Sequence, residues 1–144
     1  MGFLDKVFNK KPRLTVKEKI PVEAEKAAEI LKQKGYRADY TIQSLMDVDR
    51  FIDDESHSKG LLHGNIQPIM FSLGAYFGET LIRSYGGKWV VFENDQDHSN
   101  VRVADEILVK PIIKCQKRYS MGEDESIYEF ALEIKKNMRS LKEF

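Results

Sequence analysis

The stretch "FSLGAYFGETLIRSYGGKW", residues 71–89, decides the fold of this chain. Together with the residues before it, its pattern predicts a helix over residues 65–84. At about 100° per residue the apolar side chains cover a wide arc, which is typical of a central helix with neighbours on most sides. The arc consists of Ile66, Ile69, Met70, Leu73, Phe77 and Leu81, extended by Gly74, Gly78 and Ile82, while Ser72, Glu79 and Arg83 lie roughly opposite.

Gly74 and Gly78 stand one helical turn apart inside this predicted helix. Small residues at this spacing let another backbone come close, at a cost of about 1 kcal/mol each in helix propensity. We therefore predict that both are packing residues in a close helix contact. Gly86 and Gly87 then end the helix.

Two helices are predicted before the central one and two towards the end of the chain. The first begins at Pro21, a favoured first helical residue, and ends at Gly35, a favoured carboxyl-terminal cap. Thr41 can cap the second, which carries apolar residues at helical spacing. The last two are predicted over residues 112–119 and from about Asp124 to Leu141.

Short strands are predicted between the central helix and Pro111. The segment "KWVVFEN" is rich in strand formers, and "VRVADEILV" can give one or two more strands. Such short connections favour antiparallel pairing. The sequence therefore predicts an α+β fold: a predominantly helical single domain over residues 1–144, with a small antiparallel β-sheet following a central buried helix.

Composition sets limits on partners and location. The chain has 144 residues, with 23 basic and 23 acidic side chains, so no global charge attracts nucleic acid and none is expected as a partner. Its one cysteine cannot form an internal disulfide, and no apolar run is long enough for a transmembrane segment or a signal peptide. We expect a cytoplasmic protein. The sequence does not indicate an oligomeric state.

The first thirteen residues, "MGFLDKVFNKKPR", place Phe3, Leu4, Val7 and Phe8 on one helical face before a basic cluster. Two helical turns are marginal in water alone, so this segment either docks on the domain, docks on something else, or frays. A short amphipathic helix for a partner, or for weak peripheral contact with a membrane, is the more specific interpretation.

Three motifs point to a family. "DYTIQSLMDVDRFID" carries an Asp, Ser, Leu, Asp pattern, "LGAYFGE" is followed by Gly-Gly and Trp in "YGGKW", and "PIIKCQKRYSMGEDES" carries a Pro, basic, Gly, Ser pattern. Together they resemble a family of small bacterial proteins of unknown function with an LGAYxGE...GGxW pattern. The resemblance covers roughly residues 36–130 and implies a compact helical domain with a small sheet, but no reaction.

The candidate binding residues are Tyr76, Glu79, Arg83 and Trp89, around the carboxyl-terminal half of the central helix. Glu79 is the one candidate for catalysis, because a carboxylate beside Tyr76 and Arg83 can act as an acid or a base. The same spacing describes a surface ion pair of Glu79 with Arg83, or a buried structural pair. Trp89, with Tyr85, can form an aromatic wall for a ligand or belong to the core.

Three further groups of residues are weaker candidates. His57 and His63 lie near acidic residues, but their spacing matches no metal motif, so no metal site and no cofactor are predicted. Cys115 is either a nucleophile activated by neighbouring bases or a small buried thiol. The basic residues Lys110, Lys114, Lys117 and Arg118 are expected to form the solvated face of a helix.

A non-enzymatic protein-interaction or adaptor module is the function expected first, because no complete set of catalytic groups can be assembled. An immunity-type protein that neutralises a toxin is one form of it, suggested by the small format and by residues 47–55, with five acids and one base. The alternative is a small enzyme using Glu79 near Tyr76 and Trp89. A concave pocket joining these three residues would favour the enzyme.

Overall fold

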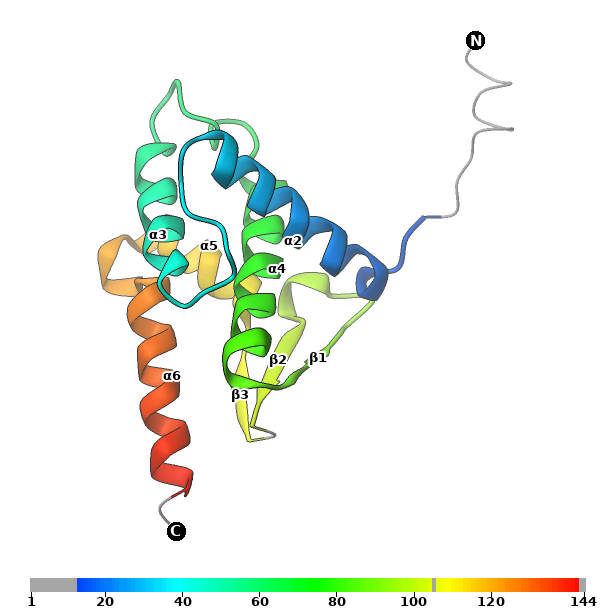
Figure 1. Ribbon diagram of the computed structural model, residues 1–144. Coiled ribbons are helices and arrows are strands. Elements are labelled where there is room, and N and C mark those ends of the chain that lie inside the picture. Colours follow the sequence, from blue (N-terminus) through cyan, green and yellow to red (C-terminus); the bar gives the residue numbers. More distant parts are fainter. Residues whose placement is uncertain (1–12, 105, 143–144) are drawn as a thin grey trace.

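The computed structural model describes residues 13–104 and 106–142, and these form helices packed around one helix, with a small sheet on one side (Figure 1). The helices are α2 (Val16–Gln33), α3 (Ser44–Asp54), α4 (Ile66–Tyr85), α5 (Pro111–Met121) and α6 (Ile127–Lys142). The strands are β1 (Lys88–Val90), β2 (Asn100–Val103) and β3 (Ile107–Val109). Short 3-10 helices cover Gln96–His98 and Glu123–Glu125. The amphipathic segment predicted over residues 1–13 lies outside the described residues, except for Arg13.

The predicted α+β fold with a small antiparallel sheet is confirmed. The strand order is β1-β2-β3, and Trp89 stands opposite Val101, which in turn stands opposite Val109. Two strands follow the turn-rich loop, as the segment "VRVADEILV" allowed. No helix in the described ranges is long and apolar enough to cross a bilayer.

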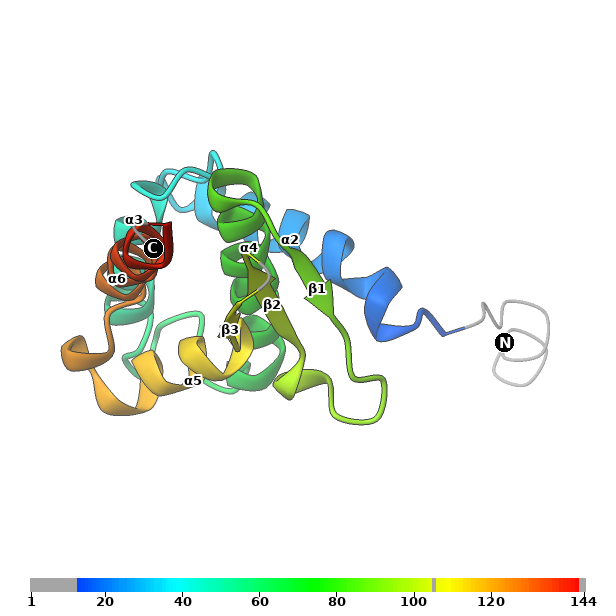
Figure 2. The same ribbon diagram turned by 90° about the horizontal axis from the view of Figure 1, so that it is seen from below.

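Helix α4 is the central element, as predicted. Every residue from Ile69 to Gly78 is buried, and α4 contacts α2, α5 and β2. Seen from below, α3 and α6 lie on one side of α4 and the sheet on the other (Figure 2). The carboxyl-terminal half of α4 carries the buried Tyr76 and Thr80 and the exposed Arg83 and Ser84.

The two glycines of α4 both allow close packing, but only one of them faces a backbone. A Cβ at Gly74 would collide with the backbone of Ile112 at the start of α5, so the predicted close helix contact is present there. A Cβ at Gly78 would collide instead with the indole ring of Trp89. The backbone approach predicted at Gly78 was wrong, because Trp89 on β1 turns its ring onto the helix.

Helix α2 begins before Pro21, contrary to the prediction. Thr15 and Glu18 form a capping box, and Glu93 accepts hydrogen bonds from the backbone N–H groups of Val16 and Lys17 at 2.8 and 3.2 Å. These contacts satisfy donors of the first turn, and they outweigh the hydrogen bond that Pro21 cannot donate inside the helix.

Other helix boundaries differ by a few residues. Gly35, at φ +85°, ends α2 as predicted, with the N–H of Tyr36 donating to the carbonyl of Leu31 at 2.8 Å. Helix α3 begins at Ser44 rather than directly after Thr41, whose Oγ1 accepts from the Ser44 N–H at 3.2 Å. Helix α6 begins at Ile127, after the 3-10 helix that occupies its predicted first turn.

Candidate functional site

Glu79 and Trp89 meet, as the sequence suggested. The indole Nε1–H of Trp89 donates to Oε1 of Glu79 at 3.3 Å, and the ring packs on Gly78. Both side chains are partly buried and line a recess of about 400 Å³. The remaining lining residues are Lys17, Ile20, Pro21, Lys88 and Val91. We call this the Glu79 recess.

Arg83 does not pair with Glu79, and the ion pair considered from the sequence is absent from the described contacts. The guanidinium carbon Cζ of Arg83 lies 3.6 Å from the ring centroid of Tyr40. A cation so close to an aromatic face is attracted by the electrons of the ring. Arg83 is therefore positioned by an aromatic ring from a different part of the chain.

Tyr40 has an uncommon backbone conformation. Its φ is +60°, in the left-handed region that side chains other than glycine rarely adopt. The backbone N–H of Tyr40 donates to the hydroxyl of Tyr76 at 3.0 Å, and the two rings lie 4.7 Å apart. The Tyr40 hydroxyl donates to Oε1 of Glu25 at 2.7 Å. Burial, and then this hydrogen bond, raise the pKa of Tyr40.

Tyr76 holds Tyr40 in place and does not join Glu79 and Trp89. It is fully buried, and its hydroxyl also lies 2.7 Å from Oγ of Ser44, the first residue of α3. Burial is the main cause that raises the pKa of Tyr76. The four candidate residues predicted from the sequence thus form two groups. Glu79 contacts Trp89, whereas Arg83 and Tyr76 both contact Tyr40.

A second recess, of about 430 Å³, lies beside Arg83, and we call it the Arg83 recess. It is built from three segments: residues 40–43, the end of α4, and α6. The hydroxyl of Tyr85 donates to the backbone carbonyl of Ala131 at 2.9 Å, which fixes α6 against α4. The recess is lined by Tyr40, Thr41, Ile42, Gln43, Arg83, Ser84, Tyr85, Leu132 and Lys135.

Two cations of the Arg83 recess have no carboxylate partner within 4.0 Å among the described residues. These are Arg83 and Lys135, and both are exposed. Lys135 and Tyr40 were not predicted as site residues. Helical spacing shows that Lys135 lies on the last helix, but nothing in the sequence places it beside Arg83.

Arg118 is buried whereas Lys110 and Lys117 are exposed, so the solvated basic face predicted for this group was wrong at Arg118. Its Nε lies 3.1 Å from Oδ1 of Asp49, and its Nη2 lies 2.8 Å from Oδ2 of Asp53. Lys114 pairs with Glu125 at 2.6 Å. Lys114 and Arg118 therefore hold α5 against other parts of the fold.

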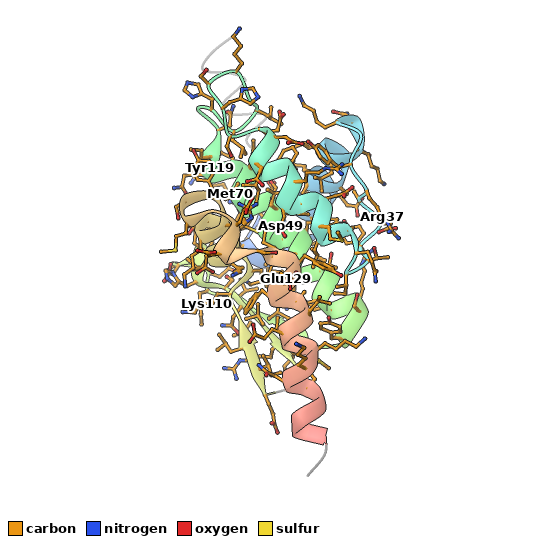
Figure 3. The ribbon with its side chains drawn as sticks, turned by 90° about the vertical axis from the view of Figure 1, so that its left-hand side faces the viewer. Arg37, Asp49, Met70, Lys110, Tyr119 and Glu129 are labelled. Carbon is orange, nitrogen blue, oxygen red and sulfur yellow. The ribbon has the colours of Figure 1, made fainter. Side chains whose placement is uncertain are left out.

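The acidic segment 47–55 is also used inside the fold. Asp49 accepts from the backbone N–H groups of Ile127 and Tyr128 at 2.9 and 3.1 Å, and so caps α6. Figure 3 labels Asp49 on α3, at the level where α6 begins. Asp47 accepts from the N–H of Arg37 at 2.6 Å. A partner that binds this acidic segment would compete with the contacts that Asp47 and Asp49 already make to Arg37 and to α6.

Cys115 is a buried thiol, the second of the two alternatives weighed from the sequence. Its exposed fraction is 0%, and burial raises its pKa, which disfavours the reactive thiolate. His57 and His63 are both exposed. Within residues 13–104 and 106–142, no three His, Cys, Asp or Glu side chains are placed to hold a metal ion together.

Comparison of the chain with models of protein families, with curated proteins and with solved structures gave no match. The family resemblance carried by the three motifs stays a prediction.

Proposed function

We propose that this chain is a non-enzymatic protein-interaction module of the bacterial cytoplasm, related to the family that its motifs resemble, and that it contacts its partner through the Arg83 recess. One observation carries the proposal. Tyr40 is held at φ +60° by Tyr76 and presents its ring to Arg83, so an exposed cation is fixed in one place before any partner arrives.

The left-handed backbone of Tyr40 has an energetic cost, and packing a core does not by itself require such a conformation. A residue other than glycine in the left-handed region costs on the order of 1–3 kcal/mol and persists only where the surroundings enforce it. Here the enforcing contacts are the Tyr76 hydroxyl and the ring contact at 4.7 Å. Backbone strain of this kind is concentrated at ligand clamps and other functional sites, and a fixed side chain loses less entropy when it binds.

The immunity-type form of the proposal was suggested by the acidic segment 47–55. Since Asp49 and Asp53 pair with Arg118, we base the contact surface on the cationic recess instead. An immunity protein would be a module of this kind whose toxin presents acidic rather than basic groups.

A small enzyme that uses Glu79 as an acid or base is the second candidate. It is favoured by the recess of about 400 Å³ in which Glu79, Trp89, Lys17 and Lys88 meet. Tyr76 is fully buried and does not line that recess, so the pocket expected to join all three residues is not formed. For this reason we place the enzyme second.

Site-specific crosslinking tests the proposed function. A photo-reactive amino acid replaces Gln43, an exposed residue of the recess, or Lys32, an exposed control on α2. In a bacterial lysate, position 43 should give a discrete adduct that disappears with Arg83→Ala, and position 32 should not give that adduct. Equal adducts at both positions, or an adduct indifferent to Arg83→Ala, would reject the proposal.

A further inference from the structure

We infer that the Arg83 recess binds a carboxylate group, held between the guanidinium of Arg83 and the ammonium of Lys135. The existence of a partner rests on the proposed function, whereas the chemistry of the ligand is inferred from the recess itself. The carboxylate can belong to an Asp or Glu side chain or to the carboxyl terminus of a partner.

The N–H groups of Arg83 are available for such a ligand. A separation of 3.6 Å between Cζ and the ring centroid of Tyr40 is that of stacked planes. The five N–H donors lie in the guanidinium plane, so stacking occupies one face and leaves these donors at the edge. No hydrogen-bond acceptor for Arg83 is found among residues 13–104 and 106–142. A planar carboxylate matches this fork with two parallel hydrogen bonds.

Lys135 supplies the second charge from a different helix. It lines the same recess, and the hydrogen bond from Tyr85 to the Ala131 carbonyl fixes the turn of α6 that precedes it. A guanidinium and an ammonium on two elements that are fixed to each other form a two-sided site. A single flexible lysine on the surface would lack this geometry.

The charges around the recess favour a single negative charge. The carboxyl-terminal end of α4 contributes only about half a negative charge, and Glu25, bound to the hydroxyl of Tyr40, contributes one. Asp39 is neutralised by Arg37 at 2.7 Å. Arg83 and Lys135 contribute one full positive charge each. Their sum exceeds the negative charge of the helix end and Glu25 by a small amount. That excess suits a carboxylate better than a dianionic phosphate or a chain of phosphates.

The test is an NMR titration of the full chain that follows the side-chain Nε–H resonance of Arg83. The probes are acetylated, amidated tetraglutamate, the matching tetraglutamine, and acetylated tetraglutamine with a free carboxyl terminus. Binding should shift the Arg83 resonance with tetraglutamate, with the free-terminus peptide, or with both, and should leave it unmoved with amidated tetraglutamine. Comparing tetraglutamate with the free-terminus peptide identifies the source of the carboxylate.

Three variants make the titration specific. Arg83→Lys keeps the charge but loses the fork, and should weaken binding about ten-fold, as expected for one lost charge-assisted hydrogen bond. Because this variant lacks the Arg83 Nε–H, its binding is followed through the backbone amide of Ser84, and the parent is measured in the same way. Lys135→Gln should also weaken it, and since Lys135 is exposed the variant should keep the fold. Lys88→Gln, in the Glu79 recess, is the control for non-specific attraction and should leave binding unchanged.

The inference is overturned if neither carboxylate probe shifts the Arg83 resonance, if inorganic phosphate shifts it and the carboxylates do not, or if Lys88→Gln weakens binding as much as Lys135→Gln. An Arg83-dependent crosslink at position 43 together with any of these results would keep the interaction module and reject its carboxylate ligand. Carboxylate binding without such a crosslink would keep the carboxylate site and reject the interaction module.

Discussion

The guanidinium of Arg83 lies on the ring of Tyr40, with Cζ 3.6 Å from the ring centroid. This contact joins the last turn of α4 to the connection between α2 and α3. Because Tyr40 is itself held by Tyr76 from inside the core, the position of an exposed cation is controlled by a buried hydroxyl. Tyr40 and Tyr76 therefore belong both to the packing of the domain and to the proposed site.

The backbone of Tyr40 gives the first prediction. At φ +60° a Cβ is disfavoured, so Tyr40→Gly should be more stable than Tyr40→Ala by about 1 kcal/mol. Both variants lose the ring, which cancels in the comparison. Urea denaturation of the two variants measures the difference. An alanine variant as stable as the glycine variant would show that Tyr40 is not held in the left-handed conformation.

Gly78 and Trp89 give the second prediction. A side chain at position 78 must displace the indole ring, so Gly78→Leu should destabilise the fold by about 1–3 kcal/mol or more. Gly78→Ala should also destabilise the parent. In a Trp89→Ala background the same change should become neutral or stabilising, because alanine is the better helix former by about 1 kcal/mol. A thermal melt of Gly78→Leu that matches the parent would contradict this packing.

Asp49 gives the third prediction, with Asp53 as its matched control. Asp49 is 14% exposed and joins Arg118 to the start of α6, whereas Asp53 is 51% exposed. Asp49→Asn takes away one of the two carboxylates that Arg118 contacts and weakens the cap of α6, so it should cost about 1.5–3 kcal/mol of unfolding free energy. Asp53→Asn should cost about 1 kcal/mol or less. Similar losses for the two variants in urea would refute the central role of Asp49.

Tyr36 gives the fourth prediction, which concerns pH. Burial, and then the hydrogen bond that Tyr36 donates to Asp54, raise the pKa of Tyr36 from 10.0 to about 12. The unfolded chain therefore releases this proton first as pH rises, and the folded state loses stability between pH 10 and about 12. Below pH 10 the contribution is constant. Tyr36→Phe should make the loss of stability above pH 10 less steep, and an unchanged slope would show that Tyr36 ionises alike in both states.

The sequence predicted the features that depend on local periodicity. The wide apolar arc around Leu73 and Phe77 marked α4 as central, and Gly35 marked the end of α2, because both patterns are contained within a few helical turns. The start of α2 was missed although Thr15 and Glu18 form a capping box, a local signal of a helix start. The second cap, from Glu93, joins residues distant in sequence. Pro21 alone suggested a later start.

The contacts that form the site were harder to predict because they join distant residues of no fixed spacing. Arg118 and Asp49 are 69 positions apart, so each looked like a member of a solvated charged face. Arg83 was recognised as a candidate, but its partner was taken to be Glu79, the nearest opposite charge on the same helix. A tyrosine in the left-handed conformation leaves no mark in the sequence, since glycine or asparagine is the usual residue there.

The most direct measurement compares the affinity of the partner captured at position 43 for three chains: the parent, Arg83→Ala and Glu79→Gln. Glu79→Gln is nearly isosteric and should keep the fold, since an amide oxygen can still accept from Trp89. We predict that Arg83→Ala raises the dissociation constant at least about ten-fold, as the loss of a charge-assisted contact implies, and that Glu79→Gln leaves it unchanged. Binding that survives Arg83→Ala and is lost with Glu79→Gln would place the site in the other recess and contradict the proposed function.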